Sequence, residues 1–198
     1  MRYGLMSLGF AVAAVFLVFA QGQQPARAQG ADVVSQEVNS LFDGLCLAYL
    51  GRGQDMLDQA QSIGAKQIPQ FFAQQFLGKH AGVAVTIQGQ GSLYMLGLTE
   101  QPACVIAAPE ANGVAVSKAF AAGAQRLPMT HGVVDGQYQQ VYAVIRKDAV
   151  TGQQKRMIVT VVISPNQSTP GVVMTALPAV TAAALGMKPD AWPEVSAE

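Results

Sequence analysis

The chain contains two cysteines, Cys46 and Cys104, and the relation between them constrains its fold more than any other feature. A bridge between them would close a loop of 58 residues, from 46 to 104. On the chain-entropy model, closing such a loop destabilises the unfolded state by roughly 4 kcal/mol. Oxidising compartments favour disulfides, whereas the cytosol keeps thiols reduced. Whether the cysteines pair therefore depends on where the protein resides.

The first 28 residues have the layout of a secretory signal peptide. Arg2 provides a positive charge, residues 3–20 are uncharged, and Ala26-Arg27-Ala28 fits the small-x-small pattern of a cleavage site. We expect cleavage after Ala28 and a periplasmic or secreted protein. The alternative is an uncleaved membrane anchor, because an apolar run of about 18 residues is near the lower limit for crossing a bilayer. In an exported protein, the two cysteines are expected to form a disulfide.

The composition excludes several classes of function. Hydrophobic residues make up 51% of the chain and charged residues 12%, which favours a packed core over disorder. Cleavage would leave ten basic and twelve acidic residues, a net charge of −2. Nucleic-acid binding needs a basic footprint, so we expect no nucleic-acid partner. The sequence has no C-x-x-C pair, serine-hydrolase motif, metal-ligand cluster or phosphate-binding loop, so we expect no cofactor and no metal.

The mature chain predicts one α+β domain over residues 29–188 and an irregular C-terminal tail, 189–198. N-terminal helices and one later helix are expected to pack on one face of a mostly antiparallel sheet of about five to seven strands. The predicted helices begin at Val33, after an Asp32 cap, and cover 54–65, 69–78 and 112–122. The predicted strands are 81–88, 92–98, 103–108, 130–136, 139–147, 155–164 and 171–177. Cys46 would then lie on the first helix and Cys104 on the third strand, within bridging range if the helix packs on the sheet.

Three stretches carry a resemblance to a known group of proteins. These are "LCLAYLGRGQDMLDQAQSIGAKQIP", "LGLTEQPACVIAAPEANG" and the β-rich segment that ends near Trp192. Together they resemble a group of small exported proteobacterial proteins, in which a helix bearing one cysteine is followed by a strand bearing another. The resemblance covers most of the mature chain. It supports pairing of Cys46 with Cys104, and it implies no catalytic residues.

Basic residues gather in one predicted hairpin, "RKDAVTGQQKR". Arg146, Lys147, Lys155 and Arg156 are four of the ten basic residues expected in the mature chain. Such a patch could bind anionic partners, such as lipid headgroups or acidic cell-wall polymers. The same charges also fit a solvated hairpin end that discourages strand pairing, which is the interpretation that the low net charge favours.

We expect a non-catalytic binding or accessory module. Its partner would be an envelope protein, an envelope component or a second copy of the chain, with membrane contact only through an uncleaved signal segment. Two alternatives stay open: an exported hydrolase-type enzyme that uses Cys104 or His131, and a component of a secretion system. A thiol enzyme would need a free cysteine beside a histidine base, whereas the module needs neither.

Overall fold

The computed structural model describes residues 24–90, 92–134, 136–164 and 171–193. Most of the expected signal peptide and the last five residues lie outside this part of the chain. The helices are α2 (Gln24–Leu41), the π-helix η1 (Phe42–Leu47), α3 (Gly53–Ser62), α4 (Gln70–Leu77), α5 (Gly113–Ala121) and α6 (Ala179–Ala184). The strands are β1 (Lys66–Gln67), β2 (Gly82–Gln88), β3 (Leu93–Thr99), β4 (Ala103–Ala108), β5 (Arg126–Val134), β6 (Gln137–Lys147), β7 (Gln154–Ile163) and β8 (Val172–Pro178).

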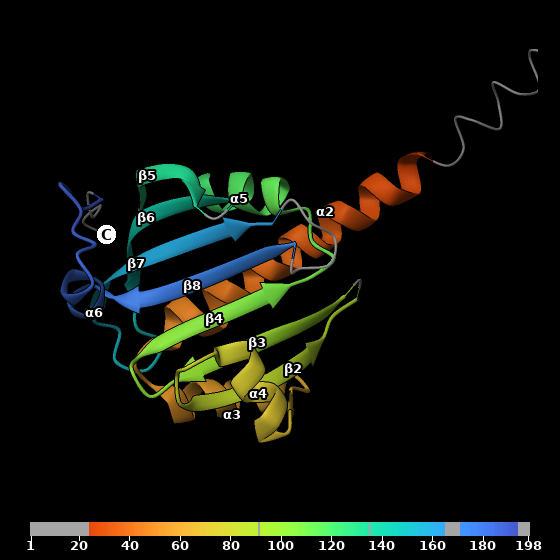
Figure 1. Ribbon diagram of the computed structural model, residues 1–198, viewed down its shortest axis with the longest axis horizontal. Coiled ribbons are helices and arrows are strands. Elements are labelled where there is room, and N and C mark those ends of the chain that lie inside the picture. The colour runs from red at the N-terminus through yellow and green to blue at the C-terminus, as the bar shows by residue number, and fades with distance from the viewer. Residues whose placement is uncertain (1–23, 91, 135, 165–170, 194–198) are drawn as a thin grey trace, which may run out of the picture.

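The α+β class is confirmed, with one eight-stranded antiparallel sheet in the described residues, slightly larger than predicted. The strand order is β1-β2-β3-β4-β8-β7-β6-β5, so two four-stranded meanders meet where β4 pairs with β8 (Figure 1). The predicted hairpins β2–β3 and β6–β7 are both present. The chain passes from the first meander to the second through α5, whose predicted cap is confirmed because Asn112 accepts a hydrogen bond from the Ala115 backbone.

Side chains alternate between the two faces along each strand. We call the face that packs against α2, η1, α3 and α5 the inner face, and the opposite one the outer face. On β7, Met157 belongs to the main core under the inner face, whereas Ile158 belongs to a small cluster on the outer face. Phe120 of α5 lies within the main core, edge-to-face with Phe42 at 5.8 Å and with Tyr142 at 5.2 Å between ring centroids.

The long N-terminal helix begins earlier than predicted. It is already helical at Gln24, the first residue that the structure describes, rather than beginning at Val33, and it contains Pro25. The expected cleavage point after Ala28 therefore lies within α2. The helix continues into η1, which no sequence pattern indicated. A π-helical turn shifts the residues that follow around the helix axis, and Phe42, Leu45 and Cys46 are all buried there.

The two cysteines form the predicted disulfide. Cys46 lies in η1 and Cys104 in β4, with their Cα atoms 5.3 Å apart and both side chains fully buried. The sulfur of Met56, from α3, lies 3.4 Å from the sulfur of Cys104. The bridge thus joins the end of the long helix to a central strand, with α3 packed beside it.

Two buried polar contacts also fasten the inner helices to the sheet. Glu37 of α2 accepts a hydrogen bond from the Tyr94 hydroxyl at 2.6 Å, and burial together with this bond raises the pKa of Tyr94. Arg126 of β5 donates to both carboxylate oxygens of Asp43 in η1, at 2.7 and 2.5 Å. Burial lowers the pKa of Arg126, while the Asp43 charge opposes that shift. Tyr94 and Arg126, whose pKa values are shifted, thus join strands of the sheet to the inner helices.

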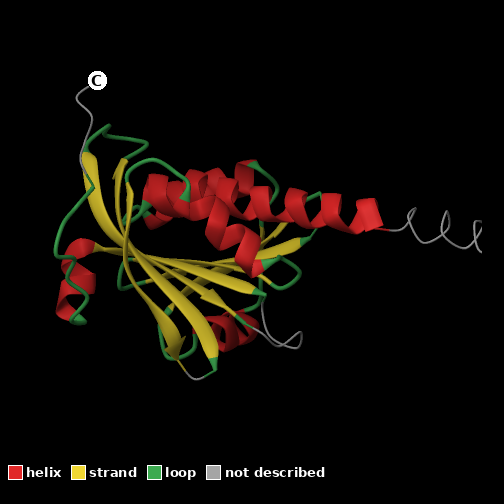
Figure 2. Ribbon diagram, turned by 90° about the horizontal axis from the view of Figure 1, so that it is seen from above, coloured by secondary structure: helices red, strands yellow, loops and turns green. Residues whose placement is uncertain are grey.

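Helices cover the outer face as well, although the sequence predicted them on one face only. Figure 2 shows the long helix along one side of a twisted sheet and short helices on the other side. Gly97 of β3 faces α4, and a Cβ there would lie 2.6 Å from Leu77 and 2.8 Å from Phe76. The glycine therefore allows α4 to approach the sheet closely. At the other end of the outer face, Ala182 of α6 packs in the cluster that contains Ile158.

Helix α4 does not bury all of its aromatic residues. Phe72 is 55% exposed, although Phe76, four residues later on the same helical face, is half-buried. The helix buries Ala73 and Leu77, and Leu77 and Phe76 face Gly97 of β3. Across the described ranges, no helix is long and apolar enough to cross a membrane.

Candidate binding groove

The four basic residues of the predicted patch do not share one surface. Arg146 pairs with Lys155 across β6 and β7, and both point toward the inner side, because the neighbouring pair of Ile145 and Arg156 points outward. Lys147 points outward with Arg156 by the same alternation. The hairpin therefore presents two cations to each side of the sheet.

Lys155 has a structural role. Its ammonium group pairs with the Asp148 carboxylate and donates to the Leu50 carbonyl at 2.8 Å. The same carboxylate accepts from the Arg52 guanidinium at 3.2 Å and from the Thr151 backbone at 2.7 Å. These bonds fasten the β6–β7 loop to the turn that follows η1. Lys155 is thus neutralised within the fold and adds little net charge to the surface.

The pKa of the Asp148 carboxyl reflects its hydrogen bonds to Lys155 and to the loop. Its side chain has no exposed surface, and burial alone would raise its pKa. The hydrogen bonds from Lys155 and from the loop at Val150 and Thr151 outweigh burial and hold the pKa of Asp148 well below its usual range. Asp148 is therefore ionised near neutral pH, and its carboxylate binds Lys155 and Arg52.

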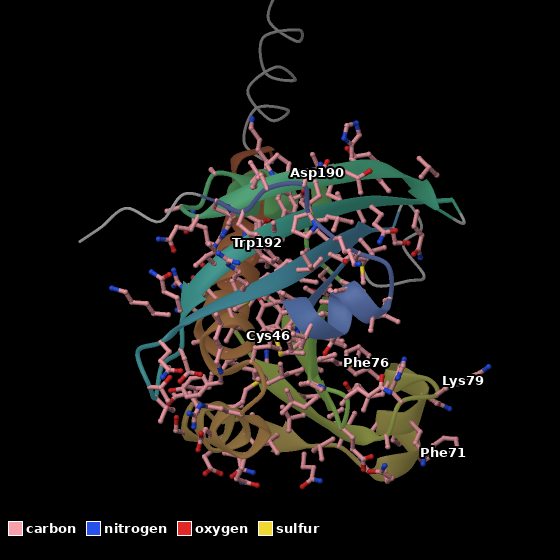
Figure 3. All side chains as sticks on the ribbon, turned by 90° about the vertical axis from the view of Figure 1, so that its left-hand side faces the viewer. Cys46, Phe71, Phe76, Lys79, Asp190 and Trp192 are labelled. Atoms are coloured by element: carbon pink, nitrogen blue, oxygen red, sulfur yellow. A yellow bond between two sulfur atoms is a disulfide. The ribbon has the colours of Figure 1, made fainter. Side chains whose placement is uncertain are left out.

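An open groove of about 850 Å³ lies at the end of the sheet where β7 begins and β8 ends. It reaches round the end of the sheet to Leu50 and Lys155, which belong to the inner side, and it opens mainly on the outer side. One wall is α6 and another is the segment that follows it, residues 187–192. Figure 3, seen from this side, shows Trp192 on the chain segment that follows α6. A volume between about 300 and 1,000 Å³ is typical of small-ligand sites.

The shape of the groove depends on how α6 ends. Gly186 adopts a φ of +81°, and its N–H bonds to the Ala183 carbonyl at 3.1 Å. The N–H of Met187 reaches back to the Ala182 carbonyl at 2.9 Å, which completes a Schellman motif. Met187 and Trp192 then pack against the outer cluster. The motif turns the chain back over the sheet, so the tail that the sequence predicted as irregular forms a wall of the groove.

The lining combines apolar surface with positive charge. Its main apolar side chains are Leu50, Pro178, Val180, Ala183, Met187 and Trp192. Its charged side chains are Lys155, Arg156 and Lys188, and the described residues that line it include no Asp, Glu, Ser, Cys or His. The Arg156 guanidinium carbon lies 5.4 Å from the centre of the Trp192 ring, a cation–π distance that holds the arginine at the groove. Because Lys155 is paired with Asp148, the net positive charge of the groove comes from Arg156 and Lys188.

The residues of the enzyme alternative lie elsewhere. Cys104 is buried in the disulfide and presents no thiol. His131 is exposed on β5, with its ring 6.5 Å from that of Tyr138. Neither residue lines the groove. Within the described part of the chain, no group of three His, Cys, Asp or Glu side chains could hold a metal ion.

A second cleft, of about 490 Å³, lies between α5 and β6. There the side-chain oxygen of Gln140 accepts hydrogen bonds from the Ser117 hydroxyl and, at 2.6 Å, from the Tyr142 hydroxyl. The Gln140 amide donates to the Tyr138 hydroxyl at 3.2 Å. Because Ser117 donates to an amide oxygen rather than to a base, the cleft contains a hydrogen-bond network and no activated nucleophile.

The sequence analysis identified Lys155 and Arg156 but missed Trp192, Lys188 and α6. Signals for α6 exist in the sequence, since Pro178 precedes an alanine-rich run and Gly186 follows it, the usual residues at the two ends of a helix. Comparison with known proteins found no matching family model, no similar curated protein and no similar solved structure. We therefore infer function from the geometry of this chain.

Proposed function

We propose that this protein is an exported, non-catalytic binding module that holds a component of the cell envelope in the groove beside α6. The groove itself carries the proposal. It has the volume of a ligand site, a largely apolar lining and a tryptophan at its wall. Ligand sites typically combine such a surface with a few polar groups that orient the ligand, a role that Arg156 and Lys188 fit.

Binding is favoured over catalysis because the described lining offers no acid, hydroxyl, thiol or imidazole. Its one tightly held cation, Lys155, is fixed as a partner of Asp148. The signal-peptide pattern and the disulfide agree with residence outside the cytoplasm. A bridge between η1 and β4 would keep the scaffold folded there, while α6 and the segment after it provide the contact surface.

The test uses a neutral fluorescent probe, N-phenyl-1-naphthylamine, with purified protein and two matched variants. Ala183 lines the groove, and Ala184 is the next residue of α6 but is exposed and does not line it. We expect one saturable site in the wild type, loss of that site in Ala183→Trp, which fills the groove, and retention in Ala184→Trp. Absence of a site in the wild type, or equal binding by both variants, would contradict the proposal. Thermal unfolding of each variant verifies that the fold is intact.

A further inference from the structure

We infer that the groove selects an amphipathic anion, a single hydrocarbon chain that carries a phosphate or carboxylate head. This inference rests on the proposed function and names the class of ligand. It follows from three observations: the apolar surface, the surplus of positive charge and the way in which Arg156 is held.

The apolar part of the lining fits a hydrocarbon chain. Val180, Ala183 and Met187 line the groove from α6 and its C-terminal turn, Leu50 lines it from the turn after η1, and Pro178 lies at the end of β8. Apart from Trp192, Gln154 is the one uncharged hydrogen-bonding side chain in the described lining. A long apolar chain could bury its surface along the apolar residues, at about 25 cal/mol for each Å² removed from water. A compact polar ligand such as a sugar would leave its hydroxyls without partners there.

The positive charge of the groove indicates that the head group of the ligand is an anion. Arg156 and Lys188 line the groove, and neither takes part in an ion pair among the residues that the structure describes. The acidic residue nearest in sequence to Lys188, Asp190, does not line the groove, although it lines an adjoining cleft that shares Met187, Lys188 and Pro189 with it. Two unpaired cations beside apolar surface attract an anion and disfavour a cationic amphiphile.

The position of Arg156 makes it the stronger of the two anion contacts. Its guanidinium carbon lies over the Trp192 ring, 5.4 Å from the ring centre, which restricts the side chain before a ligand arrives. The guanidinium donates no hydrogen bond to another described residue, so its N–H groups remain for phosphate or carboxylate oxygens, whose geometry they match. Lys188, which is exposed, supplies a more mobile second charge.

The experiment compares ligands that share one chain and differ in the head. Dodecyl phosphate, dodecyltrimethylammonium and inorganic phosphate are titrated calorimetrically, with both amphiphiles kept below their micelle concentrations. We expect dodecyl phosphate to bind at one site at least tenfold more tightly than the cationic amphiphile, and inorganic phosphate to bind far more weakly. Equal binding of the two amphiphiles would overturn the inference while leaving the proposed function intact. If neither amphiphile nor the neutral naphthylamine binds, the proposed function fails as well.

A pair of matched variants tests where the anionic head group of the ligand binds. Arg156→Gln removes the arginine at the groove, and Arg146→Gln removes one from the paired strand, on the opposite side of the sheet. We expect Arg156→Gln to weaken the binding of dodecyl phosphate about tenfold, because one charge-assisted hydrogen bond is lost. We expect Arg146→Gln to have no effect on this binding. Equal effects of the two variants would mean that the net charge of the protein, and not contact with Arg156, selects the anionic head group. That result would contradict the role given to Arg156.

Two natural sources share this chemistry, a free amphiphile and a lipid in a bilayer. Cosedimentation with phosphatidylglycerol vesicles, compared with phosphatidylcholine vesicles, distinguishes them. Binding of monomeric dodecyl phosphate without vesicle binding assigns a free amphiphile. Vesicle binding that Ala183→Trp abolishes assigns a bilayer lipid drawn into the groove. Vesicle binding that survives Ala183→Trp, with no binding of the monomer, would overturn the groove as the site.

Discussion

The two faces of the sheet differ in how they are covered. On the inner face, α2, η1, α3 and α5 enclose the main core, and the disulfide and the Asp43–Arg126 pair join helix to strand. On the outer face, two short helices cover parts of the sheet. The outer cluster there has four buried residues, three from strands and one from α6: Val141, Ala143, Ile158 and Ala182. Under our proposal, stability and binding therefore depend mainly on opposite sides of one sheet.

This division has a physical reason. A surface that binds a ligand must leave apolar area uncovered, which a folding core cannot do. Val180 of α6 is 80% exposed and Leu185, the C-cap of that helix, is 66% exposed, whereas Phe42 and Phe120 on the inner side have no exposed surface. We expect the inner side, which has the larger core and the covalent and ionic contacts, to contribute more to stability than the outer side.

Removal of the disulfide should have the largest effect on stability. The variant Cys46→Ala/Cys104→Ala frees a loop of 58 residues, so we expect a loss of roughly 4 kcal/mol in the free energy of unfolding. Chemical denaturation of both proteins measures it, and reduction of the wild type with dithiothreitol in denaturant serves as the control. A loss below about 1 kcal/mol would show that the inner side does not depend on the bridge.

Two adjacent residues of β7 test the comparison directly. Met157 lies in the main core and Ile158 in the outer cluster, with 0% and 1% of their surfaces exposed. We expect Met157→Ala to cost about 4 kcal/mol and Ile158→Ala about 2 kcal/mol, because the thinly covered outer side can relax around a cavity. Urea denaturation of each variant measures the two losses. Equal losses, or the reverse order, would mean that the two faces are equally rigid.

Substitution of Asp148 should have a smaller effect on the free energy of unfolding, and this effect should depend on pH. Asp148→Asn leaves Lys155 and Arg52 without their buried anion, at a cost of about 2 kcal/mol near neutral pH. The pKa of Asp148 is lowered in the folded state, so its contribution is complete above the ordinary value of 3.8 and declines as the pH falls below it. Denaturation of both proteins at about pH 7 and about pH 2.5 should therefore show a gap that narrows in acid. A gap that is unchanged or wider in acid would contradict the role of this carboxylate.

The inner side was largely predictable from the sequence. The run "ACVIAA" between two prolines matches β4, because short apolar runs between helix and sheet breakers have few alternatives. The Asn112 cap was confirmed by its bond to Ala115. The Cys46–Cys104 pair followed from there being two cysteines and an expected oxidising compartment. These features depend on local pattern or on simple counting.

The groove was not predictable in the same way. It combines Leu50, Arg156, Val180 and Trp192, which lie far apart in the sequence and meet only because β7 pairs with β8 and Gly186 turns the tail back. The basic hairpin illustrates the same limit. Its four charges are neighbours along the chain, but the two-residue period of the strands sends them to opposite faces.

Amide hydrogen exchange with and without dodecyl phosphate tests the central claim, that the outer side binds and the inner side supports. The amides of Leu185, Gly186 and Met187 close the end of α6 through hydrogen bonds, so they report opening of the groove wall. The account predicts that the ligand slows exchange at these amides and leaves η1 and β4 unchanged. Slowed exchange around the Ser117–Gln140 cleft, with no change at α6, would contradict it.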